Sequence, residues 1–256
     1  MNKSLASAAV ALVLAGGAVA CGSSDDVPST KERTLTVLAA SSLTGTFTDL
    51  GEQFEAAHPG VRVKLVFDSS ATLAQQAVER APGDVLATAD QQTMDQAETG
   101  GGIDGQPAQF ATNVVMLAVP KDNPAKISTL ADLDKAGVDY LTCVPTAPCG
   151  AAAETLLQQD HVERKPVSQE VDVKSVLTKV EAGEADAGLV YQTDVTGSDG
   201  KVTGVTVPGA AESPNTYWVA TTTNAKDAEL AADWVAFLTG TEGQAVLKAA
   251  GFGTVD

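Results

Sequence analysis

Two pairs of neighbouring serines are the residues whose type and spacing point most directly to chemistry. Ser41–Ser42 follows the apolar run 34–39, and Ser69–Ser70 follows the apolar run 61–67. In each case a segment with helical spacing of apolar residues begins directly after the serines. A helix start offers backbone N–H groups without an internal partner and a favourable dipole. Hydroxyl groups placed there predict an anion-binding site.

Two further junctions, later in the chain, share this pattern of donors. Pro148–Gly150 and Asp172–Val173 each open a segment with helical spacing, and none of the four junctions contains Arg or His. The nearby Lys174 follows Asp172, which is a natural helix N-cap. A site made of hydroxyl and amide donors suits a fully deprotonated oxyanion, because such a ligand offers only acceptors. A protonated phosphate also needs an acceptor and is therefore disfavoured.

Two other interpretations of the serines stay open at this point. Each serine can serve only as a cap for its own helix, which is a common use of serine. An exported serine hydrolase with Ser42 or Ser70 as nucleophile is a remote alternative, because it needs a neighbouring base and acid. The chain has no Gly-x-Ser-x-Gly sequence, and His58 and His161 lie in segments remote from both serines. The sequence therefore favours a binding protein over an enzyme.

The elements that must position these residues alternate between short apolar and amphipathic segments. Leu43, Phe47, Leu50 and Phe54 are spaced so that they form one face of a helix. Strands are predicted at 34–39, 61–67, 84–89, 114–119, 139–144, 187–191 and 216–222. Helices are predicted at 43–57, 71–80, 91–99, 130–136, 150–159, 173–180, 227–238 and 243–250. This order predicts an α/β fold with mainly parallel sheets and right-handed crossovers.

Composition narrows the classes of function. The 256 residues include 16 Lys and Arg against 33 Asp and Glu, which gives a formal net charge of −17, and 44% are apolar. The apolar fraction is ample for a folded core, and the acidic balance argues against a nucleic-acid partner. With two His and three Cys, a zinc or haem site built from several such ligands is nearly excluded.

The N-terminal segment is typical of export. Lys3 precedes the apolar run 5–20, which is too short for a comfortable membrane span. Small residues directly before Cys21 resemble a bacterial lipoprotein processing site. We therefore predict a signal peptide over 1–20, lipidation of Cys21, and a polar tether over 21–33 that holds the protein on the outer face of the cell membrane. Ordinary signal cleavage, with Cys21 left free, is the alternative.

The two remaining cysteines, Cys143 and Cys149, predict a disulfide bond. An even pair outside the cytoplasm is normally oxidised. Closing so short a loop stabilises the fold by roughly 2 kcal/mol in the chain-entropy model. A metal or redox role is the weaker interpretation, because there is no Cys-x-x-Cys spacing and no neighbouring histidine.

At these junctions the sequence resembles the molybdate-binding proteins that supply bacterial ABC transporters. The segments that carry the resemblance are Ala39–Thr44, Asp68–Gln76, Asp84–Asp90, Gly188–Tyr191 and the ending 237–252. The first reads AASSLT and the fourth reads GLVY, which is a fairly specific combination. The resemblance extends over about residues 34–253.

The resemblance implies a type II periplasmic-binding-protein fold, in which two α/β lobes enclose the ligand in the cleft between them. Each lobe of that fold contains a mixed, mainly parallel sheet flanked by helices. We expect the first lobe to comprise 34–111 and 217–256, and the second lobe to comprise 112–216.

Carried over residue by residue, the resemblance implies five ligand contacts. Three are side-chain hydroxyls, those of Ser42, Ser70 and Tyr191. The other two are backbone amides, those of Cys149 and Val173. Judged from its position in the sequence alone, Tyr191 could equally be a half-buried core residue at the end of a strand.

Three neighbours of the serines also affect the predicted binding site. Ala40 and Ala71 flank the serines and are expected to add backbone contacts. Asp68 departs from the family pattern, and a carboxylate that pointed inward would repel a dianion.

The ligand implied by the resemblance is molybdate, with tungstate as a second ligand, and the implied partner is an ABC transporter permease. We expect a monomeric protein without a cofactor and without a metal site other than the bound oxyanion. A receptor for sulfate or another small oxyanion keeps the same fold and is the alternative. Specificity between molybdate and sulfate should then depend on cavity size, because both ions only accept hydrogen bonds.

Overall fold

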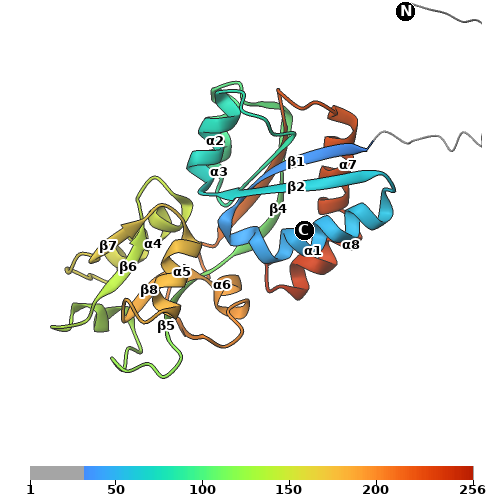
Figure 1. The fold of residues 1–256 in the computed structure, drawn as a ribbon. Helices are drawn as coiled ribbons and strands as arrows, with labels where there is room; N and C mark the ends of the chain where they lie inside the picture. Colours follow the sequence, from blue (N-terminus) through green and yellow to red (C-terminus); the bar gives the residue numbers. More distant parts are fainter. Residues whose placement is uncertain (1–31, 256) are drawn as a thin grey trace, which may run out of the picture. The chain divides into compact units, whose positions relative to one another are not determined.

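The computed structural model describes residues 32–255. In this part of the chain two five-stranded sheets are each covered by helices (Figure 1). The predicted signal peptide, the predicted lipidation site Cys21 and nearly all of the predicted tether lie outside the described residues. None of the helices within residues 32–255 is long and apolar enough to cross a membrane.

The first sheet has the strand order β2-β1-β3-β10-β4. Its strands are β1 (Arg33–Ala40), β2 (Val61–Asp68), β3 (Val85–Thr88), β4 (Ile103–Asn113) and β10 (Asn215–Thr222). β1 is parallel to β2 and β3, whereas β10 is antiparallel to β3 and β4. The helices of this sheet are η1 (Ser41–Leu43), α1 (Thr44–Ala57), α2 (Ser70–Val78), α3 (Gln91–Thr99), α7 (Ala228–Thr239) and α8 (Thr241–Ala249).

The second sheet has the strand order β7-β6-β8-β5-β9. Its strands are β5 (Val115–Pro120), β6 (Tyr140–Cys143), β7 (Ser168–Glu170), β8 (Ala187–Tyr191) and β9 (Val202–Thr206). β6 is parallel to β7 and β8, whereas β5 is antiparallel to β8 and β9. Its helices are η2 (Leu130–Asp134), α4 (Pro148–Gln159), α5 (Val173–Glu181) and α6 (Gln192–Thr196).

Alternate residues of β1 pack against different helices. Val37 belongs to a cluster with residues of α1, α7 and α8, whereas Leu38 packs with residues of α2 and α3 on the other face. In the first cluster the ring of Trp234 meets those of Phe47 and Phe54 edge to face, with centroids 5.7 and 5.2 Å apart. Complete burial of a phenylalanine is worth about 1.5–3 kcal/mol. This cluster therefore fixes the junction between β1 and α1.

The second sheet has one continuous core, in which strand residues such as Leu117 and Leu189 pack with helix residues such as Ala153 and Val176. Gly188 of β8 lies directly against α5, and a Cβ there would come within 2.6 Å of the Val176 side chain. The close packing of α5 on β8 sets the start of that helix relative to the end of the strand.

Four elements are absent from the sequence-based prediction: β4, β7, β9 and α6. β4 contains Pro107 and Gly105, which has a φ of 74°, and its pairing with β10 has register shifts. These features break the alternation by which a strand is identified. The predicted helix 130–136 is also corrected, because the structure has only the 3-10 helix η2 there, followed by Gly137 at a φ of 82°.

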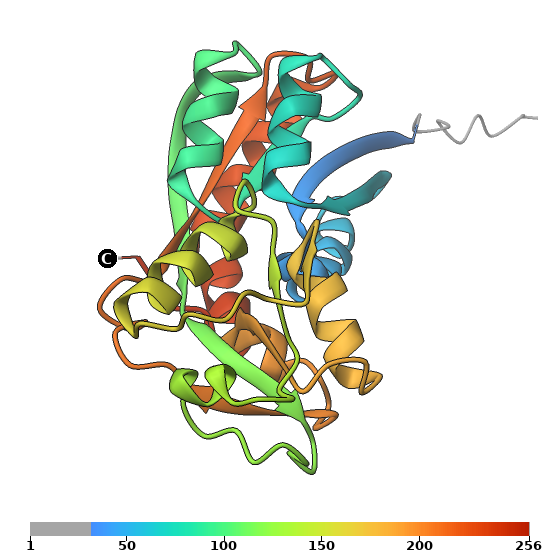
Figure 2. The ribbon, with the colours of Figure 1, turned by 90° about the vertical axis from the view of Figure 1, so that its left-hand side faces the viewer.

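The chain passes between the two sheets twice. Val114 joins β4 to β5, and residues 207–214 join β9 to β10. The green ribbon of β4 runs on directly into β5 in Figure 2. The last residues of β4 and the first residues of β10 therefore lie where the two sheets adjoin.

Candidate functional site

A small pocket lies where helix starts from the two sheets meet. Its empty volume of about 200 Å³ includes space open to solvent. The lining residues are Ala40, Ser41, Ser42, Ser69, Ser70, Ala89, Pro148, Cys149, Asp172, Val173 and Tyr191. The structure thus brings together all five residues expected to contact the ligand, and Ala40 with them. Ala71 is not among the lining residues.

The hydroxyls of Ser42 and Ser70 do not cap their own helices. Ser42 Oγ lies 2.9 Å from the hydroxyl oxygen of Tyr217, and Ser70 Oγ accepts a hydrogen bond of 2.9 Å from the amide of Ala89. The capping interpretation is therefore wrong for both residues. Since Ser70 Oγ already accepts from Ala89, its own hydrogen remains available to an acceptor in the pocket.

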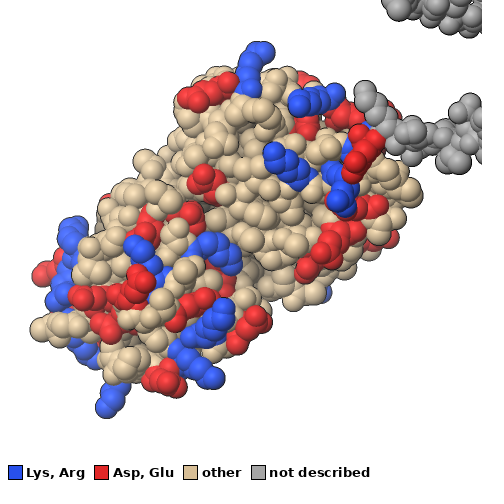
Figure 3. All heavy atoms as spheres, viewed as in Figure 1, with Lys and Arg blue, Asp and Glu red and all other residues tan. Residues whose placement is uncertain are grey.

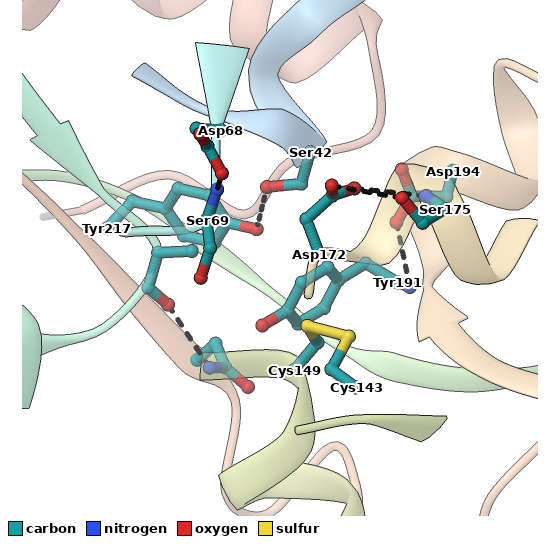
Figure 4. The surroundings of a disulfide bond; sticks show 12 residues. Ser42, Asp68, Ser69, Cys143, Cys149, Asp172, Ser175, Tyr191, Asp194 and Tyr217 are labelled. Atoms are coloured by element: carbon teal, nitrogen blue, oxygen red, sulfur yellow. Dashed lines mark hydrogen bonds between the residues drawn. A yellow bond between two sulfur atoms is a disulfide. The ribbon is translucent and has the colours of Figure 1, made fainter. Parts of the chain in front are cut away.

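Two further hydroxyls at the pocket have no hydrogen-bond partner among residues 32–255. They are Ser69 Oγ and Tyr191 Oη, and the two residues are only 6% and 1% exposed. Figure 4 shows Ser42, Ser69 and Tyr191 approaching a common space from different elements. A buried hydroxyl without a partner is costly, so these two groups point to a ligand or to bound water.

Burial keeps the phenol of Tyr191 protonated. Its pKa is raised well above the ordinary value, first by desolvation and then by the proximity of Tyr217, Asp90 and Asp194. Tyr191 therefore keeps its proton at neutral pH and can donate a hydrogen bond. Its position at the end of β8 is that of a fully buried residue whose hydroxyl faces the pocket rather than solvent.

The second sheet adds backbone donors at the starts of α4 and α5. Within the described residues, the amides of Cys149 and Val173 have no backbone or side-chain acceptor. Gly150 allows α4 to begin tightly against the end of β6, because a Cβ there would overlap the carbonyl oxygen of Val144. Cys149 is also joined to Cys143 by a disulfide bond (Figure 4). Both contacts fix the start of α4, where Cys149 lines the pocket.

The acidic residue that lines the pocket is Asp172 rather than Asp68. Asp68 Oδ1 accepts from the amide of Ser69 at 2.7 Å, and Asp68 is not a lining residue. The carboxylate of Asp172 accepts from the amide and the hydroxyl of Ser175, at 3.0 and 3.1 Å. It caps α5, as expected from the sequence, and Figure 4 shows it turned toward Ser175.

A buried carboxylate paired with a partly exposed lysine lies behind Tyr191. Asp194 is fully buried, accepts from the amide of Tyr191 at 3.0 Å and lies 3.0 Å from Lys174 Nζ. Burial raises the pKa of Asp194, and Lys174 opposes that effect. Lys174 does not line the pocket, and neither do His58 and His161. The donors that face the pocket are thus uncharged hydroxyls and amides.

The sequence marked the Ser69–Ser70 pair, but only Ser70 was expected to contact the ligand, whereas the structure also places Ser69 at the pocket with a hydroxyl that has no partner among the described residues. Sequence reasoning missed Tyr217 and Asn113 behind Ser42. No local pattern marks either of these two, because the contacts join segments 104 to 175 residues apart.

Comparisons with known proteins identify the family of this chain. A family model described as bacterial extracellular solute-binding protein matches residues 35–253. The molybdate-binding protein ModA of Mycobacterium tuberculosis is 39% identical over 253 residues, which cover 97% of this chain and 97% of that protein.

Solved structures share the fold. The periplasmic molybdate-binding protein of Azotobacter vinelandii superposes with a TM-score of 0.76 and 21% identity, covering 87% of this chain and 100% of that chain. The sulfate-binding protein SubI of Mycobacterium tuberculosis gives a TM-score of 0.77 and 18% identity, with 88% of both chains covered. The fold is thus the two-lobe type II fold of periplasmic binding proteins. Because the family model and the ModA relative match nearly the whole chain, the protein belongs to the bacterial extracellular solute-binding proteins, in the family of the molybdate-binding protein ModA.

Proposed function

We propose that the protein captures molybdate, and tungstate as well, outside the cytoplasm and delivers it to an ABC transporter permease. The observation that carries this proposal is the donor set of the pocket. Ser42, Ser70 and Tyr191 offer hydroxyls, and Cys149 and Val173 offer amides, from both sheets. A tetrahedral oxyanion without protons can accept from all of them at once.

Uncharged donors suit this role because the protein has to bind the anion and later release it to the permease. Each hydrogen bond to a charged group contributes about 1.5–3 kcal/mol, so several of them offset the cost of taking a dianion out of water. The protein is acidic, with a formal net charge of −17, and Lys and Arg side chains are interspersed with Asp and Glu on the face in Figure 3. Capture therefore depends on converging donors at short range rather than on a basic surface.

In this proposal the ligand closes the molecule. The two lobes are residues 34–111 with 217–256, and residues 112–216, and each supplies part of the donor set. A form in which the lobes are apart offers the anion only one part of the donors. The ligand consequently favours the closed form by its differential affinity, and the closed form is what a permease would recognise.

Calorimetric titration with molybdate, tungstate, sulfate and phosphate tests the ligand. We expect tight binding of molybdate and tungstate, weaker binding of sulfate and the weakest binding of phosphate. At a hundredfold excess over the dissociation constant, molybdate should raise the unfolding free energy by about 2.7 kcal/mol. Sulfate binding as tight as that of molybdate would instead favour the sulfate-receptor alternative, which the fold shared with SubI leaves open.

Substitution of the hydroxyl donors tests the site. Ser70→Ala and Ser42→Ala should each weaken molybdate binding by about 1.5–3 kcal/mol, because each removes one hydrogen bond to a charged ligand. Thr239→Ala is a suitable control, since its hydroxyl bonds only the carbonyls of α7. Unchanged affinity in both serine variants would refute the site assignment.

The anchor and the oligomeric state are part of the same proposal. The full chain is expected to be cleaved before Cys21, lipidated there and recovered with membranes as a monomer. Cys21→Ser should release the protein into the soluble fraction while its affinity for molybdate stays the same. Ordinary cleavage would leave the wild-type protein soluble as well.

A further inference from the structure

The hydroxyl of Ser42 is held from behind the pocket by a chain of buried polar groups. Ser42 Oγ lies 2.9 Å from Tyr217 Oη, and Asn113 Nδ2 lies 3.3 Å from the same oxygen. Asn113 Nδ2 also lies 2.8 Å from Thr193 Oγ1. All four residues are at most 8% exposed. The group links β10, the last residue of β4 and α6 to the serine in η1, directly before α1.

The orientation of the Asn113 side chain determines which groups donate in these hydrogen bonds. Its Oδ1 accepts from the amide of Val114 at 3.0 Å. An amide N–H has to meet an oxygen, so this contact fixes which end of the Asn113 side chain is the NH₂ group. Asn113 therefore donates one hydrogen to Thr193 and the other to Tyr217.

Tyr217 in turn determines whether Ser42 donates or accepts in the hydrogen bond between them. Burial raises the pKa of Tyr217, so its phenol keeps its proton. Among the described residues, Ser42 Oγ is the only acceptor within reach of that hydrogen. If Ser42 donated instead, the hydroxyl hydrogen of Tyr217 would be buried without a partner, which is unfavourable. Tyr217 thus donates to Ser42, and the hydrogen of Ser42 is left facing the pocket.

We propose that Tyr217 and Asn113 are positioning residues that restrict Ser42 to donating, so that the pocket rejects an anion that carries a proton. The proposal rests on the function proposed above. An unrestrained serine hydroxyl can rotate and accept a hydrogen bond, and it would then tolerate hydrogen phosphate. Tyr217 occupies one of the two lone pairs of Ser42 Oγ, and turning the other toward the anion would leave the Ser42 hydrogen without an acceptor among the described residues. Ser42 therefore meets the proton of such an anion with a hydrogen of its own.

The direct test compares molybdate with inorganic phosphate in Tyr217→Phe. At about pH 8.5 phosphate is a dianion that still keeps one proton. We expect the variant to bind molybdate less tightly and to lower the ratio of the phosphate to the molybdate dissociation constant by about tenfold, which corresponds to about 1.4 kcal/mol. A ratio equal to that of the wild type, or phosphate binding that stays undetectable while molybdate still binds, overturns the proposal.

Tyr140→Phe is the matched control. Tyr140 is also buried, and its hydroxyl donates to the carbonyl of Arg164 at 2.6 Å, but it does not line the pocket. It should lower the thermal midpoint without ligand and leave the anion ratio as in the wild type. A ratio that moves as far as in Tyr217→Phe would mean that any lost buried hydroxyl loosens the pocket, which overturns the proposal.

A double-mutant cycle shows whether Tyr217 acts through Ser42. In a Ser42→Ala background, Tyr217→Phe should leave the anion ratio unchanged, and an equal shift in both backgrounds contradicts the proposal. Should Tyr217→Phe fail to fold, Ser42→Ala alone decides, because it should weaken molybdate binding more than phosphate binding. Equal losses for the two anions overturn the inference, and a wild-type protein that binds neither anion overturns the proposed function as well.

Discussion

The two sides of the pocket present their hydrogens in different ways. On the first-sheet side the donors are the hydroxyls of Ser42, Ser69 and Ser70, and two of these are oriented by partners behind them. On the second-sheet side they are mainly the amides of Cys149 and Val173, fixed by the helix starts themselves. A hydroxyl can rotate, whereas an amide cannot. The first side therefore depends on side chains and the second on backbone geometry.

The largest effect is expected where the backbone of the second side is disturbed. Gly150→Val should lower the unfolding free energy by about 3 kcal/mol or more, because the new side chain collides with the Val144 carbonyl at the start of α4. Molybdate binding should fall with it, since the Cys149 amide moves. Chemical denaturation and calorimetry measure the two effects. Gly45→Ala is the control, as a Cβ there meets nothing within 4 Å, and it should leave both quantities near wild type or slightly improved.

Tyr191 is the one side-chain donor on the second side, and its removal should affect binding alone. Tyr191→Phe is expected to weaken molybdate binding by about 1.5–3 kcal/mol, because its hydroxyl has no partner in residues 32–255 and is free for the ligand. The unfolding free energy without ligand should stay the same or rise. A loss of stability without a loss of affinity would assign Tyr191 to the core instead.

Ser69 tests whether the first side has a third hydroxyl donor. Ser69→Ala should weaken molybdate binding by about 1 kcal/mol and leave the thermal midpoint without ligand unchanged or higher, since the hydroxyl makes no hydrogen bond with any other described residue. Ser198→Ala is the control, because Ser198 is also buried but donates to the Val195 carbonyl at 2.7 Å. That variant should lose stability and keep its affinity. The reverse pattern would remove Ser69 from the site.

The smallest effect concerns how α5 is held on the second side. Lys179 Nζ lies 2.6 Å from Glu170 Oε1, and this contact together with Ser168 lowers the pKa of Glu170. A lowered pKa stabilises the fold above the ordinary glutamate pKa, and that contribution is lost as the pH falls through the lowered value. Glu170→Gln should thus cost about 0.5 kcal/mol at neutral pH, and the difference from wild type should shrink in acid. Denaturation curves at several pH values measure this, and a constant difference would contradict it.

Much of the fold could be predicted because its signals are local. The spacing of Leu43, Phe47, Leu50 and Phe54 identifies the buried face of α1, and all four are completely buried. The same logic located α3 and β8 to the residue. The edge strands β4 and β7 could not be identified in this way, because β4 has three consecutive exposed residues and β7 is only three residues long.

By itself, the sequence determined where strands end and helices begin, and therefore which serines, amides and tyrosine stand at helix starts. That information is local, because periodicity and turn residues act over a few positions. Only the tertiary structure decided which hydroxyls are free and which way their hydrogens point. Ser42 owes its direction to Tyr217, 175 residues away, because a hydrogen bond depends on atoms within about 3 Å in space and not on separation along the chain.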